Sequence, residues 1–168
     1  HTPLLMSNIL DRGATVAPNE EIVTLTETGV RRQTYRETRD RAHQLAHALA
    51  GAGIKVGDRV GTFMWNGSRH LEAYHAVAGM GAVLHTLNVR LSPKDLEYII
   101  NHAEDQIIIV DADVLPLLEV LNGKIPTVRK IIVATEDGFE GWSEAQWDTK
   151  IERIIGTFMK KAKKKHED

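Results

Sequence analysis

Cysteine is absent from the 168 residues of this chain, which excludes disulfide bonds, thiolate metal ligands and a cysteine nucleophile. The formal net charge is only −2, so the overall charge does not favour binding to nucleic acid or to an anionic membrane. No apolar run approaches the roughly 18 residues that a membrane-spanning helix needs, and no signal-peptide pattern opens the sequence. We therefore expect a cytoplasmic protein with no nucleic-acid partner and no transmembrane segment.

Motifs of nucleophilic catalysis and phosphate binding are missing as well. No serine lies in the G-x-S-x-G turn that exposes a catalytic serine. The glycine pairs Gly51/Gly53 and Gly79/Gly81 follow predicted helices, whereas a phosphate loop places its glycines between a strand and a helix N-terminus. We interpret these glycines as helix ends, and we predict no catalytic and no cofactor-binding residue in this chain.

One pair of histidines has the spacing of a zinc site. His43 and His47 lie four residues apart on a predicted helix, but no glutamate base stands between them. Arg36 and Asp40 extend the same stripe, which indicates the solvent-exposed face of the helix. We therefore predict no metal site.

Short apolar runs alternate with helical patterns through the middle of the chain. Strands are predicted over Val60–Trp65, Val83–Leu91, Gln106–Val110 and Val128–Ala134. The intervening helices are predicted to start at three capping residues, Ser68, Ser92 and Asp113. Because strand–helix–strand units in series produce parallel strands, the sequence predicts an α/β fold with a doubly wound, mostly parallel sheet flanked by helices.

The region before this sheet has local signals of its own. A short helix is predicted over Leu4–Gly13, and a β-hairpin is predicted from Glu21–Leu25 and Val30–Gln33. Thr34 and Glu37 have the spacing of a capping box, which predicts the start of a long helix.

The end of the chain has a different pattern. Residues Ser143–Lys165 place their apolar side chains on one stripe and end in a basic run, which predicts an amphipathic helix. We therefore divide the chain into an α/β domain over residues 1–142 and a basic helical tail over residues 143–168.

Two carboxylates follow the apolar strand predicted at Gln106–Val110. Asp111 and Asp113 lie at the carboxyl end of this strand, where α/β proteins tend to bind ligands. Asp113 is also in position to cap the next helix, and we favour that role. Trp65, at the end of an earlier strand, is interpreted as a packing residue.

Three segments in series resemble motifs of one enzyme superfamily. Gly81–Ala103 (GAVLHTLNVRLSPKDLEYIINHA) is similar to a signature of AMP-forming acyl-CoA synthetases, which are adenylate-forming enzymes. Thr34–Leu49 and Gly57–His70 resemble the first and second core motifs of that superfamily, in the same order. Val89 departs from the pattern, because the family usually has proline there. The chain resembles long- and medium-chain fatty-acyl-CoA synthetases, and also the ligases that activate methylmercaptopropionate.

The resemblance implies that residues 1–142 form the first α/β subdomain of a fatty-acid–CoA ligase, whereas the tail over residues 143–168 does not resemble the family. The parent family uses a fatty acid, ATP, magnesium and CoA, and the resemblance also suggests a homodimer. The family's ATP phosphate loop, ribose aspartate and catalytic lysine have no counterpart in this sequence. We therefore expect the isolated chain to be inactive.

The polar residues of the strand predicted over Val83–Leu91 have two interpretations. The resemblance implies that His85, Asn88 and Arg90 support the substrate pocket or an interface of the complete enzyme. In the self-contained alternative, Arg90 pairs with an acid such as Asp95 or Glu97, and His85 is a partly buried histidine with satisfied hydrogen bonds.

Two other functions compete with the ligase hypothesis. The chain could be a non-catalytic α/β scaffold or dimerisation module, in which the amphipathic tail covers an exposed face. It could also be a flavodoxin-like nucleotide binder, although such a protein needs a phosphate-binding loop after a strand.

Overall fold

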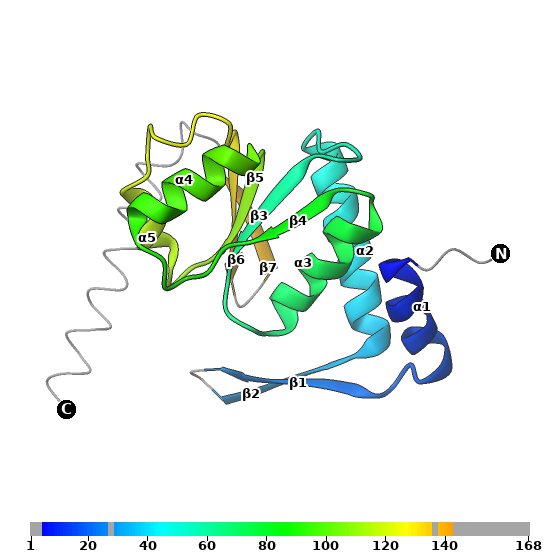
Figure 1. Ribbon diagram of the computed structural model, residues 1–168. Helices are drawn as coiled ribbons and strands as arrows, with labels where there is room; N and C mark the ends of the chain where they lie inside the picture. The colour runs from blue at the N-terminus through cyan, green and yellow to red at the C-terminus, as the bar shows by residue number, and fades with distance from the viewer. Residues whose placement is uncertain (1–4, 27–28, 136–137, 143–168) are drawn as a thin grey trace, which may run out of the picture.

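The computed structural model describes residues 5–26, 29–135 and 138–142 (Figure 1). The helices are α1 (Met6–Val16), α2 (Tyr35–Gly51), α3 (Ser68–Gly79), α4 (Pro93–Ala103) and α5 (Leu115–Glu119). The strands are β1 (Glu21–Thr26), β2 (Gly29–Thr34), β3 (Arg59–Phe63), β4 (Val83–Thr86), β5 (Ile107–Asp111), β6 (Lys130–Thr135) and β7 (Gly138–Trp142). The helix predicted over Ser143–Lys165 lies outside the described residues.

A five-stranded sheet forms the centre of the molecule, with the strand order β4-β3-β5-β6-β7. The neighbours from β4 to β6 are parallel, and β7 pairs antiparallel with β6. A separate antiparallel hairpin of β1 and β2 lies beside the helices (Figure 1). The predicted α/β fold with a mostly parallel sheet and an N-terminal hairpin is therefore confirmed.

Helices cover both faces of this sheet, as the prediction of a doubly wound fold requires. Along β5, Ile107 and Ile109 pack with side chains of α1, α2 and α3, whereas Ile108 and Val110 pack with α4 and α5. All four side chains are fully buried. Each such burial stabilises the folded state by about 1.5–3 kcal/mol, so an uninterrupted apolar strand belongs at the centre of the sheet.

Local capping signals place the two best-defined helix starts. Thr34 Oγ1 accepts a hydrogen bond from the backbone N–H of Glu37 (3.2 Å), and the Glu37 carboxylate accepts one from the backbone N–H of Thr34 (2.8 Å). The hydrogen bonds that the Glu37 carboxylate accepts from the backbone N–H and the hydroxyl of Thr34 lower the pKa of Glu37. Ser92 caps α4 through the N–H of Asp95 (3.3 Å), and Pro93 is the first helical residue. Both predicted caps are confirmed.

Two predicted helix boundaries are wrong because the decisive contacts come from distant residues. The helix α1 continues past Gly13 to Val16, and Gly13 instead makes room for Tyr35, whose Cδ2 would lie 3.3 Å from an added Cβ. Ser68 is the first residue of α3 and does not cap it; its backbone N–H donates to Thr24 Oγ1 at 3.1 Å. The hairpin therefore supplies the cap of α3.

The buried face of α3 also differs from the prediction. We expected Leu71, Tyr74, Val77 and Ala78 to face the core, but Tyr74 is 38% exposed. The buried positions are Ser68, His70, Glu72, Ala73, Ala76 and Val77. Polar side chains are buried here because the hairpin and α2 bring hydrogen-bond partners to them.

Glu72 is the centre of one such buried polar cluster. Its side chain is fully buried, and its Oε1 accepts hydrogen bonds from Gln33 Nε2 (2.9 Å) and Arg41 Nε (2.7 Å). Arg69 Nη1 lies 3.2 Å from the same oxygen. These partners come from β2, α2 and α3, so the Glu72 cluster ties the hairpin to the helical layer.

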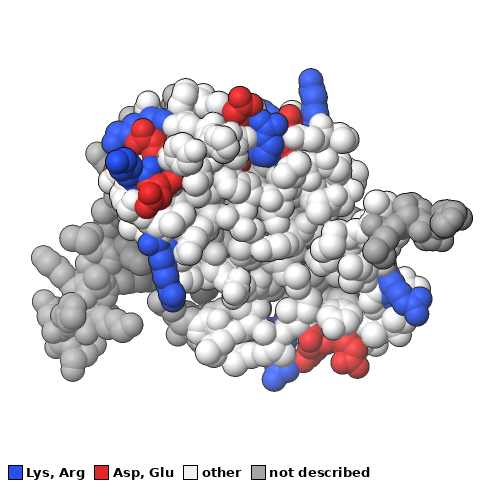
Figure 2. Space-filling model, viewed as in Figure 1, with Lys and Arg blue, Asp and Glu red and all other residues white. Residues whose placement is uncertain are grey.

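The charged side chains do not gather into a single-sign patch on the face seen in Figure 2, where they lie mainly at the margin. A nucleic-acid-binding surface would show a basic stripe. Among the described residues, none of the helices has the length and apolarity to cross a membrane.

Candidate functional site

His85, on the edge strand β4, forms an ion pair with a buried carboxylate. Its Nδ1 lies 2.8 Å from Asp105 Oδ2 and 3.1 Å from Oδ1, and Asp105 is 0% exposed. Burial raises the pKa of Asp105, while the hydrogen bond and charge of His85 oppose this shift. His85 is thus partly buried with one nitrogen satisfied, as the self-contained alternative expects. Its role in a substrate pocket stays a prediction.

Gly61 on β3 leaves the space that the Asp105 side chain occupies. An added Cβ would lie 3.1 Å from Asp105 Oδ2, 3.1 Å from Ile108 Cγ1 and 3.3 Å from Leu87 Cδ1. A side chain at this position would therefore push on the ion pair and on the core at once.

We expect Gly61→Ala to lower the free energy of unfolding by about 1–3 kcal/mol, because buried neighbours cannot move freely. Urea denaturation measures the change. Gly51→Ala is the matched control, since an added Cβ at the end of α2 has nothing within 4 Å. Equal stability of the two variants would show that the packing around Asp105 is looser than these distances state.

Asn88 and Arg90 lie in the loop between β4 and α4. The strand β4 ends at Thr86, so the prediction of a strand up to Leu91 is wrong. The next residue, Leu87, is buried. The chain turns here because Asn88 Oδ1 accepts a hydrogen bond from the backbone N–H of Arg90 (3.0 Å). Both residues are exposed.

The ion pair predicted in the self-contained alternative for Arg90 is absent. No ion pair joins Arg90 to Asp95 or Glu97. Asp95 instead accepts a hydrogen bond from the Ser92 hydroxyl at 2.7 Å. The structure therefore does not bring His85, Asn88 and Arg90 into one cluster. His85 is hydrogen-bonded to Asp105, whereas Asn88 and Arg90 lie in an exposed loop.

A second group of polar residues lies where β3 and β5 end side by side. The chain leaves β3 towards α3 on one face of the sheet and leaves β5 towards α5 on the other, which is the arrangement at which α/β proteins bind ligands. Asp111 Oδ2 accepts a hydrogen bond from the backbone N–H of Trp65 (2.7 Å), and Asp113 Oδ2 accepts one from the Trp65 indole (2.8 Å). Both the backbone N–H and the indole N–H of Trp65 are therefore held by carboxylates.

This geometry corrects two interpretations from the sequence. Asp113 does not cap α5, whose first flanking residue is Val114 with no side-chain cap. Trp65 is 47% exposed and hydrogen-bonded, so it is more than a packing residue.

Burial shifts the pKa values of two titratable side chains in this cluster, Asp111 and His70. Burial, together with the nearby charge of Asp113, raises the pKa of Asp111 to about 6. His70 Nε2 bonds to Thr62 Oγ1 (2.9 Å) and its Nδ1 to Trp65 O (3.2 Å), and burial lowers the pKa of His70. A carboxyl group with a raised pKa therefore lies beside the Trp65 indole, where β3 and β5 end.

The described residues do not provide a metal site. No group of three or more histidine or carboxylate side chains among them is arranged to hold a metal ion. His43 and His47 are exposed on α2, as expected. The magnesium ion that the family resemblance implies does not fit these residues.

Comparison with known proteins shows the enzyme family to which the chain belongs. The family model described as AMP-binding enzyme matches residues 10–168. The chain is 48% identical over 136 residues to a long-chain-fatty-acid–CoA ligase of Thermus thermophilus, covering 80% of this chain and 25% of that protein. It is 41% identical over 134 residues to a 3-methylmercaptopropionyl-CoA ligase of Ruegeria pomeroyi, covering 79% and 25%.

A solved structure has a similar fold. The N-terminal domain of FACL13 from Mycobacterium tuberculosis superposes with a TM-score of 0.73 at 26% identity, covering 79% of this chain and 34% of that one. The chain belongs to the AMP-binding enzyme family. It spans about a quarter of the length of the two curated relatives. The family match runs through residues 143–168, and the domain division after residue 142 stays a prediction.

Proposed function

We propose that this chain supplies the first α/β part of an AMP-forming fatty-acid–CoA ligase. The observation that carries the proposal is the 48% identity to the Thermus thermophilus ligase over 136 residues. In the proposed reaction, a carboxylate oxygen attacks the α-phosphorus of ATP and pyrophosphate leaves. The CoA thiol then attacks the acyl carbon, loses its proton and displaces AMP.

The contribution proposed for this chain is a rigid platform. The parallel sheet is buried on both faces, and the Glu72 cluster and the His85–Asp105 pair fix its outer elements. Rigid elements of this kind hold substrate-contacting loops in place. We propose that ATP, magnesium and CoA are bound through groups of the whole enzyme that the described residues do not contain.

A chimera tests the proposal. This chain replaces the matching quarter of the Thermus thermophilus ligase, and fatty-acid-dependent release of pyrophosphate from ATP is measured. We expect the chimera to fold and to remain active, because the two segments share a fold and nearly half of their residues. A folded chimera without activity would contradict the proposal.

Arg90 tests whether the loop after β4 contributes to that activity. Arg90→Ala should leave the melting temperature of the isolated chain unchanged, because the side chain is exposed and no ion pair joins it to Asp95 or Glu97. In the chimera we expect the same change to lower kcat/KM at least fivefold, which is about 1 kcal/mol of lost transition-state stabilisation. Lys94→Ala, on the first turn of α4, is the control. Equal activity of the two variants would remove Arg90 from the candidate site.

The substrate has a second candidate, which the 41% identity to the Ruegeria pomeroyi enzyme favours. 3-Methylmercaptopropionate is a short carboxylate that contains a thioether. Rates of the chimera and the parent enzyme with this acid and with fatty acids of increasing length would show whether this segment changes the preference.

We also propose a cytoplasmic protein that forms a homodimer. Exposed apolar side chains at the start of α1, namely Leu5 at the N-cap and Met6 and Ile9 within the helix, give a surface that an interface would cover. Light scattering measures the mass in solution, and a monomer at micromolar concentration would contradict the dimer.

A further inference from the structure

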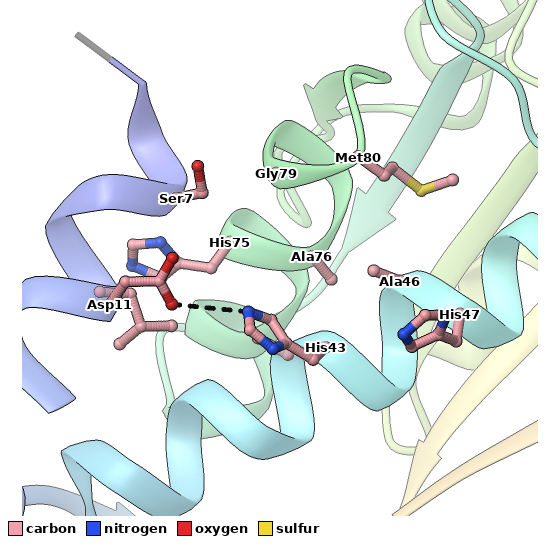
Figure 3. A pocket seen from close by; sticks show the side chains of 11 residues that line it. Ser7, Asp11, His43, Ala46, His47, His75, Ala76, Gly79 and Met80 are labelled. Atoms are coloured by element: carbon pink, nitrogen blue, oxygen red, sulfur yellow. Dashed lines mark ion pairs between the residues drawn. The ribbon is translucent and has the colours of Figure 1, made fainter. Parts of the chain in front are cut away.

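A groove lies between α1, α2 and α3, separate from the cluster around Trp65 and Asp111 (Figure 3). Its volume is about 270 Å³. Its apolar lining consists mainly of small side chains, with Leu10 on α1, Ala42 and Ala46 on α2, and Ala76 and Met80 at the end of α3. Small residues leave this space open because they do not fill the angle between the three helices.

The rim of the groove is rich in imidazole groups. His43 and His47 project from α2, His75 projects from α3, and Asp11 comes from α1 (Figure 3). Asp11 Oδ1 lies 3.6 Å from His43 Nε2, so the single carboxylate of the rim already has a partner. His47 is exposed and has no hydrogen bond or ion pair among the described residues.

We propose that this groove binds a free medium-chain monocarboxylate, with its alkyl chain on the alanine floor and its carboxylate at the imidazole rim. The inference goes beyond the proposed function, because binding here needs neither ATP nor CoA. The groove reaches the C-terminal end of α3, whereas Trp65 and Asp111 lie near the N-terminal end of the same helix. A twelve-residue helix is about 18 Å long, so the two sites are separate.

The size of the groove and the hydrogen-bond donors at its rim select this class of ligand. Pockets for drug-sized molecules begin at about 300 Å³, so a groove of 270 Å³ suits one short alkyl chain better than a bulky ligand. Imidazole N–H groups donate hydrogen bonds to a carboxylate, which is a stronger acceptor than a neutral oxygen. The same histidines and Asp11 do not form a metal site, since no three histidine or carboxylate side chains among the described residues are arranged to hold a metal ion.

Calorimetric titration of the chain with octanoate, hexanoate and 1-octanol tests the proposal. We expect one saturable site and a Kd for octanoate about three- to tenfold lower than for hexanoate, because an open groove partly buries two more methylene groups. The alcohol should bind more weakly than octanoate, since it lacks the charge.

Two variants locate the site. Ala46→Leu fills the floor and should weaken octanoate binding at least fivefold, while Ala50→Leu, at an exposed position of the same helix, should leave it unchanged. His47→Gln should weaken octanoate binding about threefold and leave 1-octanol binding unchanged, which keeps the test decisive if Ala46→Leu fails to fold. Unchanged octanoate affinity in His47→Gln, equal affinities for acid and alcohol, or binding at many weak sites would overturn the proposal.

Discussion

Replacing Glu72 by alanine should lower the free energy of unfolding by about 3–5 kcal/mol, which would be among the largest single effects in this chain. The carboxylate is fully buried and accepts hydrogen bonds from Gln33 and Arg41, and it lies beside Arg69. Its removal leaves the partly buried Arg41 guanidinium without this acceptor, and the buried Gln33 amide keeps only its hydrogen bond to Thr38. Chemical denaturation followed by circular dichroism measures the change.

The control for Glu72→Ala is an ion pair of equal length at the surface. Arg39 and Asp40 also lie 2.7 Å apart, but their side chains are 30% and 52% exposed. Solvent screening makes such a pair worth less than about 1 kcal/mol, so Asp40→Ala should have little effect. Similar losses in the two variants would mean that burial does not decide the strength of these interactions.

The second large effect concerns pH. Asp111 has a pKa of about 6 in the folded chain against 3.8 for an unperturbed aspartate, so the folded state holds this proton more tightly than the unfolded state does. The group therefore favours folding most below pH 4, and this contribution is lost as the pH rises from about 4 to about 6. Above pH 6 the ionised, partly buried carboxylate lowers stability by about 1–3 kcal/mol relative to the protonated form.

Asp111→Asn should remove this dependence. The amide oxygen still accepts the hydrogen bond from the backbone N–H of Trp65, but no charge is buried. We expect the variant to be more stable than the parent at pH 7 and equal to it near pH 4, measured by urea denaturation across that range. Asp58→Asn is the control, because Asp58 also accepts a backbone hydrogen bond, from Lys55 at 2.8 Å. A pH-independent difference between Asp111→Asn and the parent would contradict the raised pKa.

The sequence predicted the elements whose signals are local. The run Ile107–Val110 is apolar at every position, and only a strand covered on both faces buries such a run. The Thr34 and Ser92 caps depend on residues three positions away. These signals, taken in order along the chain, were enough for the layers of the fold and the parallel sheet.

The polar clusters escaped prediction because their partners are far apart in the chain. Arg41 and Glu72 are 31 residues apart, and Trp65 and Asp113 are 48 residues apart. Only the folded chain brings such residues together, so Ser68 and Asp113 were interpreted as caps from their immediate neighbours. Asp105 is fully buried just before the apolar strand β5, and a buried carboxylate needs a partner, which His85 provides.

We propose that this chain provides the platform of a carboxylate-activating ligase, and that its described residues do not include the groups that bind ATP. Calorimetric titration of the isolated chain with Mg-ATP, in the presence of a fatty acid, tests it most directly. We expect no saturable heat of binding and no pyrophosphate in the calorimeter cell. Stoichiometric binding of nucleotide, or release of pyrophosphate by this chain alone, would contradict it.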